Sequence, residues 1–442
     1  MNQDQIKAIV AQMTLEEKAA LCSGDTDWTT SGVPRLGVPP IWVSDGPYGL
    51  RKETTVGIDE ASGQPIKETV PAICFPAGVT SAASFDTGLM TAEGQALGRN
   101  CAANDVAVLL GPALNIKRSP LCGRNFEYFS EDPYLAGQIA AAYIQGVQSM
   151  GVGTSAKHFA ANSQEHRRMT SSSEVDERTL REIYLTGFEI AVKEAQPWTI
   201  MASYNKINGT YASQNKKLLS DILVDEWGFQ GFVVSDWGAV HDRSAAVAAG
   251  CALTMPEDKA NDTKLVDAVN TGRLDEAALD LACEKILGIT YRYVENRMLA
   301  EMDLESDSAL ARKIAVESMV LLKNDGMLPM SRSARTLLVG PFAKNPRYQG
   351  GGSSKTKSLR VHSALDILGD SVDYLPGFSD SDPTANDRLL ADVLAQVADY
   401  EQVVVFAGLP ESMESEGYDR QHLDLPAHQN RLIAAVAERQ PQ

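Results

Sequence analysis

GFVVSDWGAVHD, residues 231–242, is the stretch of this chain that decides the fold. Phe232–Ser235 is a short apolar run typical of a buried strand, and Asp236 and Trp237 follow it directly. A carboxylate at a strand end, beside an aromatic platform, suits attack on the anomeric carbon of a sugar. The same Asp could instead cap a helix, and this stretch alone does not decide between the two interpretations.

Similar units lie on both sides of this stretch. Apolar strand-like runs alternate with amphipathic helices through the first 300 residues, the other predicted strands being Ile41–Ser44, Val106–Leu110, Gly153–Lys157 and Thr199–Ser203. Unusual polar residues follow the runs, namely Asp45, Lys157, His158, Tyr204 and Asp236. Because the carboxyl ends of parallel strands form the active sites of β/α folds, we predict a (β/α)8-like TIM barrel over residues 1–298.

Two helices between these strands have clear signals. Asp132 and Pro133 are an N-cap and a first-turn proline, so a helix is predicted from there to Gly151. A second helix should begin near Glu177, because apolar residues recur from there at helical spacing.

A second region follows a charged stretch. We predict a linker over 299–308, a helix over Ala309–Leu322, and strands at Thr336–Val339 and Gln402–Ala407. Residues 309–442 should therefore be an α/β sandwich domain, but an incomplete one, because the chain stops after a helix without closing strands.

Two further segments carry polar residues that suit sugar binding. In SAKHFAANSQEHRR, residues 155–168, Lys157 and His158 adjoin at a strand end and could bind hydroxyl groups, although such a pair is more often on the surface. In SDGPYGLR, residues 44–51, Asp45 could accept two sugar hydroxyls, oriented by Arg51 or by Arg124. A structural salt bridge is an equal alternative.

The second region contains two segments of interest. QGGGSSKTK, residues 349–357, has Ser354 before Lys355 where a phosphate loop requires Gly, so we interpret it as a glycine-rich turn beside the active site. ESMESEGYDR, residues 411–420, places Glu414 and Glu416 in a polar loop, which on its own would be interpreted as surface.

Composition excludes several partners. Lys plus Arg number 40 against 58 Asp plus Glu, a net charge of −18, which disfavours nucleic acid. No run of eighteen apolar residues predicts a membrane span. The N-terminus resembles an amphipathic helix rather than a signal peptide, and the six scattered cysteines suit reduced thiols, so we expect a cytoplasmic protein. No HExxH or zinc pattern is present, and we predict no metal and no cofactor.

Taken together, these segments resemble glycoside hydrolase family 3. The motifs that carry the resemblance occur in the family's order: MTLEEKAAL, SDGPYGLR, GPALNIKRSPLCGRNFEYFSEDP, KHFAANSQE, MASYNKING, GFVVSDWG, ESMVLLKNDGMLP, GGGSS and SEGYDR. The resemblance covers nearly the whole chain and is closest to bacterial cytoplasmic β-glucosidases that begin with the barrel. It implies a retaining exo-acting β-glycosidase.

The resemblance also implies residue roles. Asp236 matches the nucleophile and Glu416 the acid/base. The pocket for the terminal sugar would be formed by Asp45, Arg51, Arg124, Lys157, His158, Met201, Tyr204 and the aromatic wall Trp237. A family subgroup with a histidine acid/base has KHFPGHG, whereas this chain has KHFAANSQE, which makes that mechanism improbable here.

The chain departs from the family at two points. AGCALTMP has Ala252 and Thr254 where acidic residues are expected, which would alter barrel packing or the pocket floor. Family members also continue for about 300 residues, so we expect a missing C-terminal part, without which the loop of Glu416 would lack support.

The leading hypothesis is a β-glucosidase that acts on a β-glucoside or oligosaccharide. The alternatives are a fragment that binds sugar without turnover and a β-xylosidase or another exo-glycosidase. The sequence does not determine aglycone preference, linkage preference or oligomeric state. A homo-oligomer is among the states that it allows.

Overall fold

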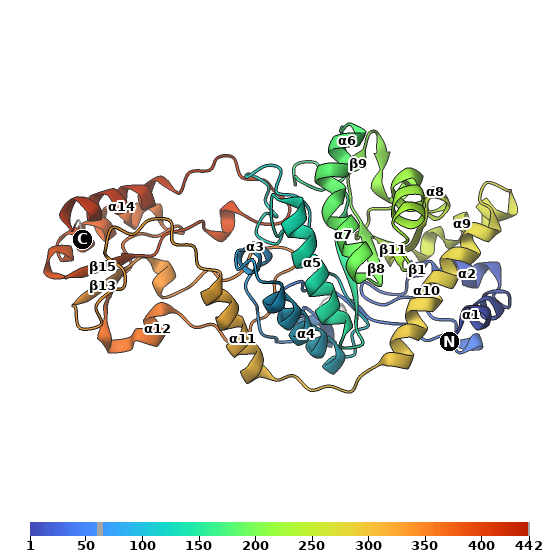
Figure 1. Ribbon diagram of the computed structural model, residues 1–442, viewed down its shortest axis with the longest axis horizontal. Helices are drawn as coiled ribbons and strands as arrows, with labels where there is room; N and C mark the ends of the chain where they lie inside the picture. The colour runs from blue at the N-terminus through green and yellow to red at the C-terminus, as the bar shows by residue number, and fades with distance from the viewer. Residues whose placement is uncertain (60–64, 441–442) are drawn as a thin grey trace.

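The computed structural model describes residues 1–59 and 65–440. The chain forms two bodies along its long axis, a larger one built from the N-terminal two thirds and a smaller one that ends at the C-terminus (Figure 1). In the part of the chain that is described, no helix is both long and apolar enough to cross a membrane.

The larger body is built on a curled parallel sheet of seven strands among the described residues. In spatial order these are β1 (Ser23–Gly24), β12 (Cys251–Glu257), β11 (Phe232–Ser235), β8 (Thr199–Ala202), β6 (Gly153–Phe159), β5 (Val108–Leu109) and β2 (Val43–Ser44). Every neighbouring pair is parallel. Between the outer strands, the N–H of Val43 donates to the carbonyl of Trp28 at 2.8 Å. The predicted TIM-barrel class is confirmed.

All five predicted strands are present, and the sequence missed two. Strand β1 has only two residues, too few to form a pattern. Strand β12 contains Ala252 and Thr254, which the sequence analysis considered as departures from the family's acidic residues and not as part of a strand. Both side chains are buried.

Helices cover the outside of this sheet (Figure 1). They are α1 (Gln3–Val10), α2 (Leu15–Leu21), α3 (Gly78–Ala82), α4 (Thr87–Ala103), α5 (Pro133–Gln148), α6 (Glu177–Thr179), α7 (Thr186–Ala195), α8 (Arg243–Ala249), α9 (Asp262–Asn270) and α10 (Glu276–Asn296). Asp132 caps α5 as predicted, accepting from the N–H of Leu135, but the helix ends three residues before Gly151. The helix predicted near Glu177 is interrupted by a π-helical segment, Leu180–Leu185.

Helix α11 (Leu304–Glu317) begins and ends five residues earlier than predicted. Its Ile314 is buried in the apolar core of the larger body, and its Asp307 pairs with Arg99 of α4. The helix starts after Asp303, whose side chain caps it by accepting from the N–H of Ser306, whereas the prediction placed the start at Ala309. The predicted domain limits of 298 and 309 stay a prediction.

The smaller body is α/β, as predicted. Its parallel strands lie in the order β14 (Asp373–Leu375), β13 (Thr336–Val339) and β15 (Gln402–Val405). The helices around them are α12 (Ala364–Leu368), α13 (Asn386–Leu394) and α14 (Ala427–Arg439). The chain that leads into β13, Met319–Leu322, is exposed.

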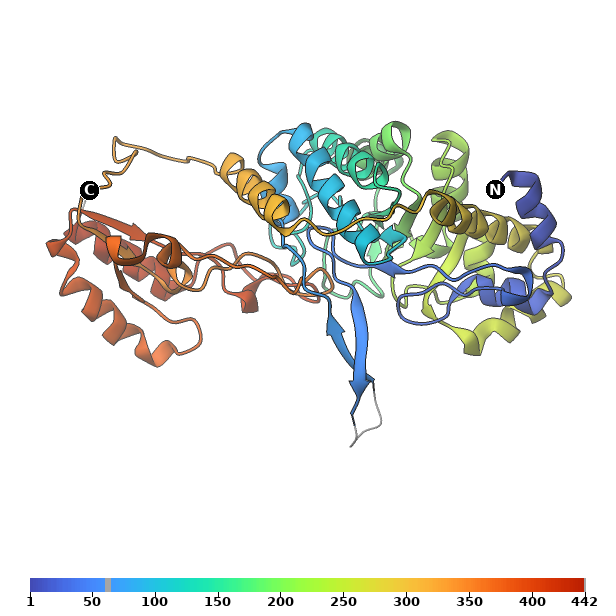
Figure 2. The same cartoon turned by 90° about the horizontal axis from the view of Figure 1, so that it is seen from below.

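Two small antiparallel or mixed elements complete the larger body. Strands β3 (Glu53–Ile58) and β4 (Pro65–Thr69) form a hairpin that projects from the molecule (Figure 2). Short strands β7 (Ser172–Ser173), β9 (Lys206–Ile207) and β10 (Thr210–Tyr211) pair beside the strand ends. The sequence predicted neither element.

Candidate active site

The structure gathers the predicted residues at the carboxyl ends of the curled sheet. Asp45 follows β2, Lys157 and His158 lie in β6, Met201 and Tyr204 lie in and after β8, and Asp236 and Trp237 follow β11. Because parallel neighbouring strands end at one edge, four segments distant in sequence meet there. Except for Trp237, which is partly exposed, these side chains are buried.

Asp45 is held by a lysine. Its Oδ1 accepts from Lys157 Nζ at 2.8 Å and from the N–H of Gly46 at 2.9 Å. The guanidinium of Arg51 instead donates to Glu53 at 2.6 Å and to the carbonyl of Ser353 at 3.0 Å. The prediction that an arginine orients Asp45 is therefore wrong for the Arg51 side chain. Arg51 instead connects the barrel to the second region through its hydrogen bond to Ser353.

Asp236 keeps one carboxylate oxygen uncommitted. Its Oδ1 accepts from the N–H of Trp237 at 2.8 Å, whereas Oδ2 is buried without a hydrogen-bond donor among the residues that the structure describes. Burial raises the pKa of Asp236, and the cations of Arg124 and Lys157 oppose that shift. A desolvated carboxylate with a free oxygen is suited to act as a nucleophile.

His158 faces that free oxygen. Its Nε2 lies 3.7 Å from Asp236 Oδ2, and its Nδ1 lies 3.3 Å from both Asn115 Oδ1 and the Tyr128 hydroxyl. Burial, followed by the charges of Arg124 and Lys157, holds the pKa of His158 well below its usual range. The imidazole is therefore neutral, and the gap to Asp236 is one that a hydroxyl group could bridge.

Tyr204 and Trp237 form the walls beside Asp236. Burial, and then the nearby carboxylate of Asp236, raise the pKa of Tyr204. The indole of Trp237 donates to the carbonyl of Asp27 at 2.8 Å, and its ring centre lies 5.3 Å from that of Trp28. Trp237 is thus anchored while one part of its ring remains exposed for stacking.

Arg124 connects the barrel with the second region. Its side chain is 1% exposed, its Nε donates to Glu127, and its Nη1 lies 3.5 Å from Glu416 Oε1. Its Nη2 has no partner among the described residues. A buried donor of this kind can bind a polar ligand.

Glu416 reaches this cluster from the second region. Its Oε1 accepts from Arg168 Nη1 at 2.8 Å and its Oε2 from the N–H of Ser353 at 2.6 Å. Although burial acts in the opposite direction, Arg124, Arg168 and that N–H hold the pKa of Glu416 well below its usual range. Glu414 points elsewhere and accepts from Arg347 at 2.9 Å.

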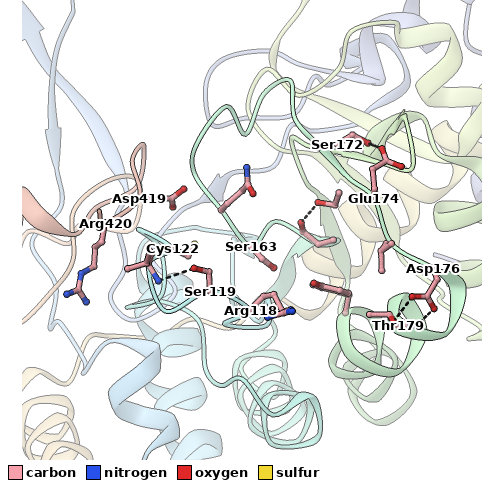
Figure 3. A pocket seen from close by; sticks show the side chains of 16 residues that line it. Arg118, Ser119, Cys122, Ser163, Ser172, Glu174, Asp176, Thr179, Asp419 and Arg420 are labelled. Atoms are coloured by element: carbon pink, nitrogen blue, oxygen red, sulfur yellow. Dashed lines mark hydrogen bonds between the residues drawn. The ribbon is translucent and has the colours of Figure 1, made fainter. Parts of the chain in front are cut away.

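Asp419 fixes the loop of Glu416 to the barrel. Its carboxylate accepts from the backbone N–H groups of Gly123 at 3.0 Å, Glu165 at 2.9 Å and His166 at 2.9 Å. The two backbones approach so closely that a Cβ on Gly123 would lie 1.8 Å from the carbonyl oxygen of Tyr418. Beside this contact lies an open pocket of about 660 Å³, with Asp419 on one side and Asp176 and Thr179 on the other (Figure 3).

The turn Gly350–Ser354 borders the site, as predicted. Gly352 has φ +104°, and a Cβ there would lie 2.4 Å from the Cβ of Glu416. Ser354 shares a hydrogen bond of 2.7 Å with the Tyr48 hydroxyl. The glycines therefore let the turn pass close to a carboxylate rather than bind a phosphate.

Sequence reasoning did not identify Arg168, Asp419 or Asn115 as part of the site. Arg168 and Asp419 lie inside segments that were singled out, HRR and EGYDR, but pattern alone does not say which charged residue turns inward. Within residues 1–59 and 65–440, no group of three or more His, Cys, Asp or Glu is arranged to hold a metal ion.

Comparisons with known proteins identify the family of this chain. Family models described as glycosyl hydrolase family 3 N terminal domain and C-terminal domain match residues 51–289 and 319–442. The chain is 50% identical over 98% of its length to thermostable beta-glucosidase B of Acetivibrio thermocellus. It is 43% identical over 97% of its length to an exo-alpha-(1->6)-L-arabinopyranosidase of Bifidobacterium breve. It spans 58% of the length of each of these relatives.

Solved structures of beta-glucosidases also match this chain. A glycoside hydrolase family 3 beta-glucosidase of Bifidobacterium adolescentis has a TM-score of 0.90 and 44% identity, and the match covers 98% of this chain and 62% of that one. The beta-glucosidase 3B of Thermotoga neapolitana in complex with glucose has a TM-score of 0.88 and 32% identity, and covers 98% and 67%.

Proposed function

The chain belongs to glycoside hydrolase family 3, and from this premise we propose that it is the catalytic part of a retaining exo-β-glucosidase. Asp236 attacks the anomeric carbon of a terminal β-glucosyl unit, while Glu416 donates its proton to the departing glycosidic oxygen. Glu416 then takes a proton from water, whose oxygen displaces Asp236 and releases glucose.

The observation that carries this proposal is that Glu416 joins the charge cluster of the nucleophile. Arg124 lies 3.5 Å from Glu416, and its charge also lowers the pKa of Asp236. The charge of Glu416 raises the pKa of Asp236. A retaining mechanism requires two carboxyl groups about 5–5.5 Å apart, on opposite sides of one sugar.

The remaining predicted residues fit the binding of the sugar. Asp45 is oriented by Lys157 and retains acceptor capacity for hydroxyl groups, and neutral His158 can share one with Asp236. We propose that these residues, together with Arg124, Met201, Tyr204 and Trp237, hold the terminal unit. Arg51 would act indirectly, through its bond to the turn of Ser353.

A second candidate substrate is an α-L-arabinopyranoside. Two Bifidobacterium relatives named for that activity are 43% identical, against 50% for the relative named beta-glucosidase, which makes the glucoside the first choice. A β-xyloside and sugar binding without turnover are the further alternatives.

A panel of nitrophenyl glycosides tests the proposal. We expect β-glucoside hydrolysis with the largest kcat/KM, and release of β-glucose as the first product in proton NMR. Dominant arabinopyranoside or xyloside hydrolysis would change the substrate, and first release of α-glucose would overturn retention. Binding of glucose by calorimetry without turnover would favour the binding fragment.

The cytoplasmic location, the oligomeric state and the expected C-terminal continuation stay predictions.

A further inference from the structure

Arg168 serves two carboxylates at once. Its Nη1 donates to Glu416 Oε1 at 2.8 Å and to Glu165 Oε2 at 2.9 Å. Its guanidinium carbon lies 4.5 Å from the ring centre of Tyr204, the residue beside the nucleophile. A single nitrogen is therefore shared between a residue of the barrel and a residue of the second region.

Glu165 has room for a second bond from this arginine. The residue is 3% exposed, and its Oε2 also accepts from the N–H of Gly417 at 2.8 Å. Its Oε1 is buried and has no donor among the described residues. Buried acceptors are rarely left without a donor, and a guanidinium can bind both oxygens of a carboxylate with two parallel bonds.

The proposed mechanism requires Glu416 in two states. It must carry a proton when the glycosidic bond breaks and be ionised when water attacks. In the free site the ionised state is favoured, because Arg124, Arg168 and the Ser353 N–H outweigh the effect of burial on the pKa of Glu416. Loss of one cationic contact would raise the pKa of Glu416 and so favour the protonated form.

We propose that Glu165 is a positioning residue that competes with Glu416 for the guanidinium of Arg168, and that this competition sets the protonation state of Glu416. The inference rests on the proposed function of Glu416. When Arg168 binds both oxygens of Glu165, Glu416 keeps only Arg124 as a cationic neighbour and takes up a proton. When Arg168 returns, Glu416 is stabilised as the base.

The other charged or titratable groups around Glu416 do not offer the same exchange. From the barrel, Arg124 is committed to Glu127, while Asp236 and Tyr204 lie on the side of the nucleophile. From its own region, Ser353 is the donor to Glu416 among the described residues. Arg124 uses different nitrogens for Glu127 and Glu416, whereas Arg168 shares one nitrogen, Nη1, between Glu416 and a second carboxylate.

The pH profile of kcat/KM on a nitrophenyl β-glucoside tests the competition. Glu165→Gln leaves Arg168 to Glu416, so the basic limb, which reports the protonated acid, should move to lower pH. Arg168→Gln removes the cation, so the basic limb should move to higher pH by roughly one unit or more. Shifts in opposite directions are a signature that general loosening of the loop does not produce. No shift, or shifts in the same direction, would overturn the proposal.

A double-mutant cycle in thermal unfolding tests the shared bond without any turnover. In the 442-residue chain, Glu165→Gln or Glu416→Gln alone leaves Arg168 one partner, whereas the double variant leaves it none. The loss of Tm in the double variant should therefore exceed the sum of the two single losses. Pairing Glu165→Gln with Glu414→Gln is the matched control, because Glu414 bonds to Arg347, and those losses should add.

The two failures can be told apart. Additive losses in the cycle of Glu165 and Glu416 would overturn the competition, whatever the kinetics show. Super-additive losses together with a Glu416 variant that shows no dependence on the leaving group would instead overturn the assignment of Glu416 as acid/base.

Discussion

The two regions of the molecule hold their halves of the site by different means. In the barrel, Asp236 continues a buried strand, and its N–H donates to the carbonyl of Ala202 at 2.9 Å on the neighbouring strand. Two large clusters of buried apolar side chains lie behind that sheet. In the second region, eight buried residues form the core, and Glu416 lies on a loop outside the strands.

The difference shows what locates the second carboxylate. Glu416 is fixed by Arg168, and its loop by Asp419, so most of its anchors belong to the barrel rather than to its own sheet. The concern raised by the sequence was that an unfinished sheet would leave this loop unsupported. The structure supplies polar contacts in place of a larger core.

The largest effect should come from the barrel side. Asp236→Ala removes the nucleophile and should lower turnover by at least about 10⁴-fold, as loss of a covalent nucleophile does elsewhere. The free energy of unfolding should change little, because Oδ2 of this buried carboxylate has no donor in the described part of the chain. Mass spectrometry after labelling with a 2-fluoroglucoside should place the sugar on Asp236.

Asp242→Ala is the matched control for that experiment. Asp242 caps α8 by accepting from two backbone N–H groups, so its loss should cost about 1 kcal/mol of stability and leave turnover intact. A label on any residue other than Asp236 would contradict the assignment.

The second-largest effect should appear in the second region and should depend on the leaving group of the substrate. Glu416→Ala should lower activity on cellobiose by about 10²–10⁴-fold, because that leaving group requires a proton. Dinitrophenyl glucoside, whose leaving group does not, should be largely spared in bond cleavage, and azide should accelerate the second step. If Glu414→Ala showed this pattern instead, the acid/base would be two residues earlier than we propose.

The third effect loosens the loop without touching either carboxylate. Asp419→Ala leaves three backbone N–H groups without their acceptor, and a displacement of about 1 Å can lower activity by about 10²-fold. We expect the loss on cellobiose and much less on dinitrophenyl glucoside. Asp424→Ala, on an exposed part of the chain, should match the parent. Equal losses on both substrates would mean that the barrel itself had been disturbed.

The smallest effect is on stability and compares an exposed leucine before the second sheet with a buried leucine of the barrel. Leu322 is 92% exposed, so Leu322→Gln should change the free energy of unfolding by less than about 0.5 kcal/mol. Leu287, buried in the barrel, should cost about 2–5 kcal/mol when changed to Ala. Denaturant unfolding of both variants checks this contrast, which would fail if Leu322→Gln cost as much as Leu287→Ala.

Sequence patterns predicted the barrel better than they predicted the contacts between regions. Strands such as Phe232–Ser235 are buried on both faces, so their composition identifies them, and the polar residue after each one marks the site. The partner of Asp45 could not be predicted in the same way. Lys157 and Arg51 are both cations near strand ends, and only the fold decides which of them reaches the carboxylate.

The packing of α11 and the part played by Arg168 were also beyond the sequence. Helix α11 begins after the N-cap Asp303, but its place against the barrel depends on the pairing of Asp307 with Arg99, 208 positions away, and on the burial of Ile314. Arg168 lies in a loop without periodicity, so nothing in the pattern indicates that its side chain turns inward.

Because the backbones approach so closely at Gly123, a mutation at this one position could separate the Glu416 loop from the strand-end residues of the barrel. A single methyl group at this position would meet the carbonyl oxygen of Tyr418 at 1.8 Å and force the Glu416 loop away from the barrel, while every strand-end residue stayed in place. One codon change could thus separate the proposed hydrolysis from the proposed binding of the sugar. Among relatives that share this loop contact, the residue at this position would be a marker of lost catalysis even where both carboxylates are still encoded.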